Sequence, residues 1–525
     1  HHLRVDGMLH GRVVRPRGQR SYMAGAKVLS VDETSIASIP GAKVVRTGDF
    51  LGVVAEQEWD AVRAAQQLKV VWEKPPALPG NAKLYETMRA AQTQDRIVTE
   101  RGDAAATIAS AKYVATQGCK SPYQSHAPFA PNCAIADVKK DSALVMCSTQ
   151  DVYATRTSLA RVLGLPVTGI RVQYHTGAGI YGHGCYDDVA HSAAIMSQLA
   201  GKPVRLLFMR WDEHGWDPYG PAHVGEVRAS ANAEGKITGY EYHGWQQNWT
   251  NVETSEQLAK GVAGAEWPGA AAQQVNPLVC GGAYDIPNLK LVNHKVPPMF
   301  RGGWLRSPLD LSFAFASEQA LDQLAFLLGL DPYQFRKQNM KDPRWIGVLD
   351  AVATASKWTP RKAASKLSSA KVVTGRGIGV GTHLVSYGAA VAEVEVNKET
   401  GKVVAKHLYG AIDAGQVVNP GNVESQIEGQ LVQVASRMFK EEIHFDETGV
   451  TSLDWNGYQI LRFEECPEVT GIVVQRMNER STGAGEESMA ACAAAIGNAF
   501  FDATGVRMHE FPMTPERVLA ALHKK

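Results

Sequence analysis

The chain has 525 residues, a formal net charge of +1 and an apolar fraction of 45%. A chain of this length exceeds one ordinary hydrophobic core, so two to four domains are expected. The nearly balanced charge excludes the strongly basic pattern of a nucleic-acid partner. No apolar run is long enough to span a bilayer, because Gly497 and Asn498 interrupt the longest, at residues 489–501.

The seven cysteines are scattered and never occur in C-x-x-C spacing. This argues against a disulfide framework, a structural zinc site or an iron–sulfur cluster within the chain. The chain opens on His1-His2 without an initiator Met or a signal segment, and a strand is predicted at once around residues 8–15. We therefore expect residues upstream to be missing, cleaved off or carried by another polypeptide.

Residues 1–115 are predicted to form a compact α+β module without a catalytic constellation. Its expected elements are strands at residues 26–31, 42–46, 50–55 and 68–72 and an amphipathic helix at residues 58–67. Residues 75–80 are rich in proline and indicate a linker.

A second region is expected at residues 116–340. Strands are predicted at residues 134–138 and 143–147, and Asp151 suits the N-cap of a helix at residues 152–163. Gln150 lies at this strand-to-helix corner, where ligands are often bound, although a single residue of this kind is more often a satisfied loop amide.

The sequence Gly177-x-Gly179-x-x-Gly182 matches the dinucleotide-binding fingerprint, with a strand before it and a helix predicted at residues 187–199. Three features count against a nucleotide. The unit lies deep in the chain, its candidate ribose-binding acids come late, and no second half of a doubly wound domain is visible. A glycine turn of this kind equally fits close approach to another polar ligand.

Arg301 and Arg306 stand beside glycines and suggest an anion site, with surface arginines as the plain alternative. A core helix is predicted at residues 311–328. Residues 251–282 are expected to form a long loop, following strands at 204–209, 226–231 and 237–243.

The third expected region comprises residues 341–525. It is predicted to open with a basic linker to residue 370. Strands at residues 391–396 and 403–409, a helix at residues 423–439 and a capped helix from residue 514 should follow.

The chemistry is placed in the segment Ser481-Thr482-Gly483-Ala484-Gly485-Glu486-Glu487. Glycines permit tight backbone approach to a ligand, and the Ala-rich run after them predicts a helix. Glu486 and Glu487 would then lie at a helix N-terminus, where the dipole favours a carboxylate, and one of them is a candidate general base. Taken alone, both are more often ordinary helix-start charges.

Several segments in order carry a family resemblance: Gly7–Pro16, Ser148-Thr149-Gln150, the Gly177–Val189 turn, Arg306 with Glu318 and Asp322, Asp331-Pro332 with Arg336 and Asn339, Asp413–Gly429, and Gly483-Ala484-Gly485-Glu486. Together they resemble the molybdopterin-binding subunit of the xanthine dehydrogenase family. The similarity is greatest to the branch with isoquinoline 1-oxidoreductase beta subunit, nicotinate dehydrogenase and bacterial aldehyde dehydrogenases. The implied fold is mixed α+β: a hammerhead-like module at residues 1–115, followed by two molybdenum-cofactor-binding regions at 116–340 and 341–525.

The resemblance implies a role for individual residues. Glu486 matches the family's catalytic glutamate, and Gln150 matches the glutamine near the metal. The cofactor-binding residues that it implies are Gln150, Gly179, Ile180, Tyr181, Arg306, Gln426 and Gly485, and no protein side chain is expected to ligate the metal. Ile180 replaces the usual Phe, Tyr181 the usual Gly, and Glu487 a frequent Pro.

By this resemblance the chain is expected to be the large subunit of a molybdenum hydroxylase, or its C-terminal part. It would oxidise an aldehyde or hydroxylate an aromatic N-heterocycle with oxygen from water, using a molybdenum–molybdopterin cytosine dinucleotide. Electrons would leave through 2Fe–2S clusters on a small partner subunit. A separate chain or cleaved N-terminal part would complete the cofactor site, and a cytochrome c subunit is a further candidate partner. A periplasmic or membrane-associated bacterial complex is favoured over the cytoplasm.

Two alternatives stay open. One is an NAD(P)-dependent dehydrogenase that uses the turn from Gly177 to Gly182. The other is a non-catalytic structural subunit of a redox complex, which the substitutions at Ile180, Tyr181 and Glu487 would fit.

Overall fold

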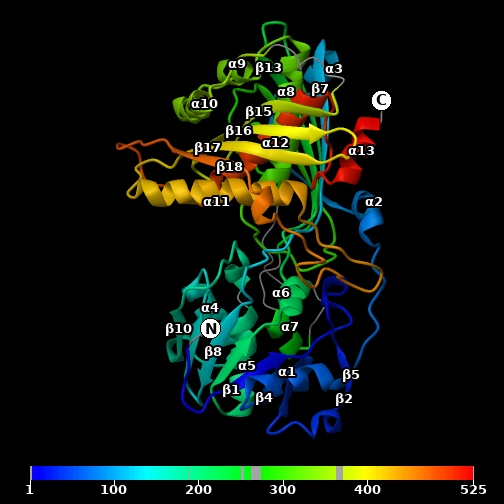
Figure 1. Ribbon diagram of the computed structural model, residues 1–525, viewed down its shortest axis with the longest axis vertical. Helices are drawn as coiled ribbons and strands as arrows, with labels where there is room; N and C mark the ends of the chain where they lie inside the picture. The colour runs from blue at the N-terminus through cyan, green and yellow to red at the C-terminus, as the bar shows by residue number, and fades with distance from the viewer. Residues whose placement is uncertain (1–2, 187, 250–253, 262–273, 362–369, 524–525) are drawn as a thin grey trace.

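The computed structural model describes residues 3–186, 188–249, 254–261, 274–361 and 370–523. Its elements form two halves along the long axis of the molecule (Figure 1). The lower half in this view contains the largest sheet, and the upper half contains two further sheets with helices between and around them. Within the described ranges, no helix combines the length and apolar character needed to cross a bilayer.

The lower half is built on a seven-stranded mixed sheet with strand order β10-β9-β8-β11-β1-β4-β3. The strands are β1 (Leu9–Val13), β3 (Lys43–Thr47), β4 (Phe50–Ala55), β8 (Cys133–Val138), β9 (Ala143–Cys147), β10 (Ile170–Tyr174) and β11 (Val204–Leu207). Helix α5 (Asp188–Ala200) packs on the sheet with α4 (Val152–Leu163) beside it, and α1 (Glu58–Gln67) lies against β1 and β4. The short helices α6 (Arg210–Trp216) and α7 (Thr254–Ala259) also lie in this half.

The first 115 residues do not form a self-contained module, which corrects that expectation. Strand β1 pairs in parallel with β11. Strands β6 (Gln94–Arg101) and β7 (Tyr113–Ser121) belong to a sheet in the other half, and β2 (Val28–Asp32) and β5 (Lys69–Trp72) pair with each other. Strands β1 to β5 were predicted from their local patterns, whereas β6 and β7 were not. A local pattern does not say which strand the fold brings alongside an unpaired strand edge.

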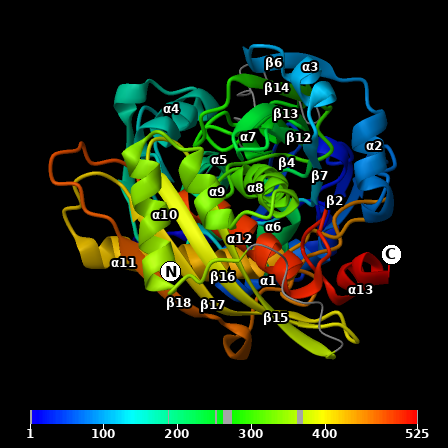
Figure 2. The same ribbon diagram turned by 90° about the horizontal axis from the view of Figure 1, so that it is seen from above.

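The upper half sandwiches two helices between two sheets. One sheet has the order β6-β14-β13-β12-β7, with β12 (His223–Ala231), β13 (Ile237–Gln246) and β14 (Asn288–Lys295). The other has the order β15-β16-β17-β18, formed by Val372–Gly381, Tyr387–Asn397, Val403–Asp413 and Glu468–Val473. Helix α8 (Asp310–Leu327) packs on β7 and β12, and α12 (Glu487–Thr504) packs on α8, β15 and β16. Figure 2 shows α8 and α12 inside this arrangement.

Two more helices cover the β15–β18 sheet, with α11 on the same face as α12 and in contact with it. Helix α10 (Pro343–Ala355) packs on β16 and β17, and α11 (Pro420–Phe439) packs on β17 and β18. The remaining helices are α2 (Leu84–Ala90), α3 (Ala104–Ser110), α9 (Pro332–Gln338) and α13 (Pro515–His523). The prediction of a linker from residue 341 is wrong for the part that forms α10, whose Asp342 cap and N1 proline are a helix-start signal. Residues 362–369 of that linker lie outside the described residues. So do residues 251–253 and 262–273 of the predicted 251–282 loop, and helix α7 is described between them.

Helix α12 lies directly against β15 because four alternating positions of the strand are glycine. A β-carbon on Gly379 would lie 2.8 Å from the carbonyl oxygen of Ala491, and one on Gly381 would lie 2.8 Å from the β-carbon of Ala490. Small residues on both surfaces therefore permit backbone-to-backbone packing. The glycines also hid β15 from the sequence prediction, because glycine has low strand propensity.

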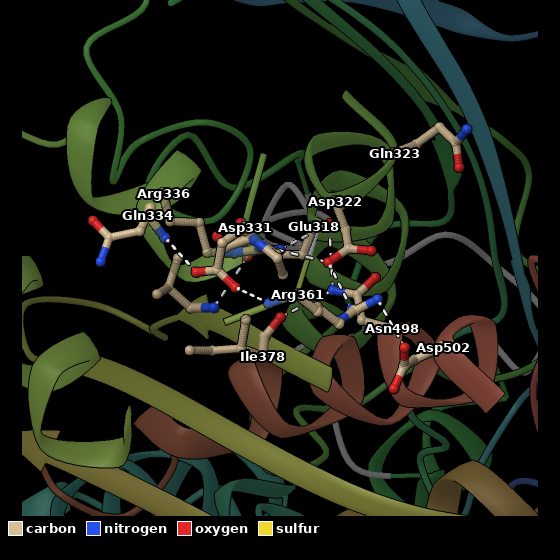
Figure 3. Close-up of polar contacts among 12 residues, drawn as sticks. Glu318, Asp322, Gln323, Asp331, Gln334, Arg336, Arg361, Ile378, Asn498 and Asp502 are labelled. Atoms are coloured by element: carbon tan, nitrogen blue, oxygen red, sulfur yellow. Dashed lines mark hydrogen bonds and ion pairs between the residues drawn. The ribbon is translucent and has the colours of Figure 1, made fainter. Parts of the chain in front are cut away.

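A buried ionic network joins α8 to its neighbours (Figure 3). Arg336 on α9 donates from Nε to Glu318 Oε2 at 2.8 Å, and the same oxygen accepts the backbone N–H of Val380 on β15 at 3.1 Å. Asn498 on α12 donates to the carbonyl oxygen of Ile378 at 3.0 Å. The Asn498 contact therefore joins α12 to β15, and the Glu318 contacts join α8 to α9 and β15.

Candidate active site

Glu486 caps the N-terminus of α12, and Glu487 is the first residue of that helix. This confirms the predicted position of the two carboxylates at a helix start. The backbone N–H of Glu486 donates to Oε2 of Glu487 at 2.9 Å. Burial raises the pKa of Glu487, while the backbone hydrogen bonds and the charge of His383 act in the opposite direction. The two neighbours are thus distinct: Glu487 is buried and bonded to the backbone, and Glu486 is partly exposed.

One oxygen of the Glu486 carboxylate is aimed at a histidine. Oε2 is shielded from solvent and accepts no hydrogen bond of acceptable geometry from the described residues. It lies 3.2 Å from Nε2 of His383, which sits between β15 and β16. Nδ1 of His383 lies 2.7 Å from Oδ2 of the buried Asp310 at the start of α8. Sequence reasoning missed both His383 and Asp310, because neither belongs to a local motif.

Arg306 joins the predicted residues from several elements. Its Nε donates to the carbonyl oxygen of Gly485 at 2.6 Å, and its Nη2 donates to Oε1 of Gln426 at 2.9 Å. Its Nη1 donates to Oε1 of Gln433 at 3.1 Å. Burial lowers the pKa of Arg306, and the negative charges of Glu486 and its neighbours oppose this effect. The guanidinium group therefore fixes the backbone just before the predicted base.

Three glutamines of α11 line one face of the site. Gln426, Gln430 and Gln433 follow the i, i+4, i+7 spacing that places side chains on one side of a helix. The buried Gln430 donates to the carbonyl oxygen of Ala484 at 2.8 Å and accepts the backbone N–H of Ser488 at 2.9 Å. It thus braces the chain on both sides of Glu486. Only Gln426 was predicted from the sequence, although the glutamine spacing is a signal that would have found the other two.

The glycine turn of the lower half meets this group of residues. The side-chain oxygen of Gln150 accepts the backbone N–H of Gly182 at 2.9 Å, and the carbonyl oxygen of Tyr181 accepts the N–H of Arg306 at 2.9 Å. Tyr181 has a φ of +51°, and its ring lies close to Gly179. Ile180 is partly buried and accepts the N–H of His183 at 2.9 Å. The site thus spans both halves of the molecule.

The same turn does not form an open phosphate cradle, so the dinucleotide interpretation is not supported. A β-carbon on Gly182 would overlap the carbonyl oxygen of Trp304, which shows that the glycine permits contact with the chain itself. At the start of α5, Asp188 accepts the backbone N–H of Ser255 at 2.8 Å and pairs with Arg15 at 3.2 Å. The surrounding sheet is mixed, whereas a dinucleotide-binding fold has a parallel one.

Arg301 and Arg306 do not form a joint anion site, contrary to that hypothesis. Arg301 is fully buried, and its Nη1 donates to Oγ1 of Thr254 at 2.8 Å, whereas Arg306 is directed toward Gly485. The two residues belong to the same segment, but their side chains point into different halves of the structure. Adjacent glycines therefore did not indicate which arginine lies in the site.

The group of residues around Glu486 suits a polar, anionic ligand approached at close range. A β-carbon added to Gly485 would meet no atom within 4 Å, so space is open beside it. The side chains of Gln150 and Gln426 are exposed, and the Gln426 amide lies next to the Arg306 guanidinium. Amides, an arginine and exposed backbone are the groups that bind phosphate and heterocyclic oxygen and nitrogen atoms. The residues present thus fit a pterin cofactor with a phosphate-bearing tail.

Comparison with known proteins agrees with this chemistry. Residues 89–340 match the model of a molybdopterin cofactor-binding domain, and residues 327–467 match a second model of the same description. A nicotinate dehydrogenase subunit of Pseudomonas putida is 36% identical over 99% of this chain. A membrane-bound aldehyde dehydrogenase (pyrroloquinoline-quinone) of Gluconacetobacter polyoxogenes is 27% identical over 99% of this chain. The chain spans 45% of the first relative and 70% of the second.

The fold is shared with solved structures. Quinoline 2-oxidoreductase from Pseudomonas putida 86 superposes with a TM-score of 0.82, covering 100% of this chain and 95% of the other at 15% sequence identity. The mixed α+β architecture predicted from the sequence is therefore confirmed. From its two domain matches, its relatives and its fold, this chain belongs to the molybdopterin-binding subunits of the xanthine dehydrogenase family.

Proposed function

We propose that this chain is the catalytic large subunit of a molybdenum hydroxylase, or a part of it. The observation that carries the proposal is the Glu486 carboxylate, which stands at the N-terminus of α12 beside the open backbone of Gly485. It does so within a chain that matches molybdopterin cofactor-binding domains at residues 89–340 and 327–467. A carboxylate next to a bound redox cofactor is placed to act as a general base.

In this proposal the molybdopterin cofactor supplies the two-electron oxidation, and the protein supplies the base and the orientation. Glu486 accepts a proton from the water that provides the oxygen atom. Arg306 and Gln426 hold the cofactor from the α11 side, and Gln150 with the turn at residues 179–181 holds it from the lower half. The contact between Arg306 and Gly485 keeps the base in register with these groups.

The substrate is proposed to be an aromatic N-heterocycle or an aldehyde. The names of the relatives support both classes, since one is a nicotinate dehydrogenase and another an aldehyde dehydrogenase. The cytosine dinucleotide form of the cofactor is proposed from the bacterial branch that the sequence resembles.

Further subunits are part of the same proposal. No cysteine motif of this chain suits an iron–sulfur cluster, so electrons would leave through 2Fe–2S clusters on a small partner subunit. A separate chain or a cleaved N-terminal part would complete the cofactor site, and a cytochrome c subunit is a candidate acceptor. A periplasmic or membrane-associated location is favoured, in keeping with the membrane-bound relative.

Metal analysis combined with one substitution tests the function. We expect the natively purified complex to contain about one molybdenum and about two or more irons per copy of this chain. Glu486→Gln should keep the molybdenum and lower turnover of aldehydes or N-heterocycles by about 10²- to 10⁴-fold. The exposed Glu464→Gln serves as the matched control and should behave as the wild type.

Two results would contradict the proposal. A Glu486→Gln complex that turns over at the wild-type rate would remove Glu486 as the base. An intact native complex without molybdenum would favour the non-catalytic subunit instead.

A further inference from the structure

The turn that leads into α8 contacts two neighbours of the predicted base. At one end, Arg306 donates to the carbonyl oxygen of Gly485 at 2.6 Å. At the other end, Asp310 lies 2.7 Å from His383, whose second ring nitrogen faces Glu486 at 3.2 Å. Between them, Ser307 and Leu309 have φ values of +59° and +60°, a conformation that costs non-glycine residues free energy. The turn thus directs Arg306 to the backbone of Gly485 and Asp310 to the side chain of His383.

The imidazole of His383 is held in one orientation. Asp310 is 1% exposed, and its Oδ2 is the partner of His383 Nδ1. Asn276 donates from Nδ2 both to Oδ1 of Asp310 at 2.8 Å and to the backbone carbonyl of His383 at 3.0 Å. With one ring nitrogen and the backbone so occupied, Nε2 is left 3.2 Å from Glu486 Oε2, a buried oxygen that accepts no hydrogen bond from the described residues.

The next two residues show that this orientation is not imposed by general burial. Leu384 and Val385 follow His383 at the tip between β15 and β16 and are 58% and 65% exposed. The histidine is directed inward while its apolar neighbours face solvent. The inward direction of His383 is therefore accompanied by polar contacts and not by apolar burial of the tip.

The charges around His383 favour its protonated form. Burial lowers the pKa of His383, but the hydrogen bond and charge of Asp310, with the charges of Glu486 and Glu487, more than reverse this and raise it to about 9. Burial raises the pKa of Asp310, and the contact with His383 opposes that shift. The side chain facing Glu486 is therefore an imidazolium at neutral pH, and carboxylates flank it on both sides.

We propose that His383 is the positioning residue of Glu486: anchored by Asp310, it holds Oε2 of the carboxylate and balances its negative charge. This inference rests on the proposed function, since it assigns the partner of the general base. A carboxylate that is held in one position with its charge balanced can accept a proton with little rearrangement of the groups around it.

Substitutions in the purified complex separate this role from simple structural support. His383→Gln keeps an N–H donor near the position of Nε2 and removes the charge. We expect it to retain molybdenum, to lower kcat about tenfold, and to move the acidic limb of the kcat/KM profile about one unit to higher pH. Asp310→Asn should shift the profile in the same direction, and the double variant should be no worse than His383→Gln, because the two act as one unit. The control is His407→Gln, a β17 histidine that contacts Thr470 and Glu468.

A second measurement does not depend on turnover. A histidine whose folded pKa is about 9, above its ordinary value of 6.5, stabilises the fold fully below pH 6.5 and loses this contribution as pH rises through 9. The thermal midpoint of the wild type and of His407→Gln should therefore fall over this range, and that of His383→Gln should fall less. Asp310→Asn removes the hydrogen bond and the charge of Asp310 that raise the pKa of His383, so its thermal midpoint should also fall less over this range.

The outcomes distinguish the inference from the proposed function. Suppose that Glu486→Gln abolishes turnover, while His383→Gln and Asp310→Asn change neither the kcat/KM profile nor the dependence of the thermal midpoint on pH. The positioning role is then wrong and the function stands. If Glu486→Gln is active, the function and this inference both fail. A uniform loss of kcat without a shift of the acidic limb would show that His383 has only a structural role.

Discussion

The Nε of Arg306 donates to the carbonyl oxygen of Gly485 at 2.6 Å, across 179 positions of the sequence. The contact connects the turn before α8 to the residue that precedes the predicted base on α12. The same arginine reaches Gln426 and Gln433 on α11, so one guanidinium group connects three helices at the site.

Replacing Arg306 by lysine should therefore impair catalysis more than folding. A lysine has a single ammonium group and cannot serve Gly485, Gln426 and Gln433 in their present directions. We expect kcat to fall about 10- to 100-fold through misplacement of Glu486, with molybdenum retained. Steady-state kinetics and metal analysis measure this, with Arg228→Lys on β12 as the control; a variant with an unchanged kcat would contradict the prediction.

Gly182→Ala should destabilise the protein strongly. Gly182 has a φ of +112°, and an added β-carbon would overlap the carbonyl oxygen of Trp304. Relieving the overlap must separate the turn from Trp304, at an expected cost of about 3 kcal/mol or more. Gly201→Ala is a matched control, because Gly201 has a φ of +64° but no atom within 4 Å, so only about 1 kcal/mol is expected. Chemical denaturation compares the free energies of unfolding of the two variants. Equal losses would show that the positive φ alone, and not the contact with Trp304, requires glycine at position 182.

The buried pair of Arg336 and Glu318 should show strong coupling. Arg336 is fully buried and lies 2.8 Å from Glu318, which is 1% exposed. Arg336→Met leaves a buried carboxylate without its cation and should lower the free energy of unfolding by about 3–5 kcal/mol. Adding Glu318→Gln removes that uncompensated charge, so the double variant should recover part of the loss. Arg228→Met is the exposed control, and additive effects in a double-mutant cycle would refute the coupling.

Glu213 should make the stability of the lower half depend on pH. Burial raises its pKa from 4.5 to about 8, against the hydrogen bonds from Asn132. The folded state thus retains a proton that the unfolded chain releases above pH 4.5, so stability should decrease as pH rises from about 4.5 through 8. Glu213→Gln removes this titration and should flatten the dependence, measured as the thermal midpoint against pH. Glu56→Gln, at an exposed site, should leave the thermal midpoint with the pH dependence of the wild type. If that dependence persists in Glu213→Gln, another group causes it.

Local patterns in the sequence were sufficient for most elements. The predicted strand at residues 50–55 and the helices at 58–67 and 152–163 have the bounds seen in the structure, and Asp151 is the cap of α4. These elements depend on periodicity and caps, which act over a few residues. Strand β15 and helix α10 were missed: the alternating glycines of β15 serve a neighbouring helix, and the basic composition around α10 obscured its start.

The sequence by itself determined the family resemblance and the position of Glu486 at a helix start, because both depend on short runs of neighbouring residues. Only the tertiary structure decided what surrounds that carboxylate. His383 lies beside it, Asp310 contacts His383, and Gln430 contacts Ala484 and Ser488 on either side of it, each from a separate element. The strands β1, β3 and β4 also join a sheet whose other strands come later in the sequence. Such contacts depend on which surfaces pack together, and packing is a property of the whole chain that no short pattern of residues encodes.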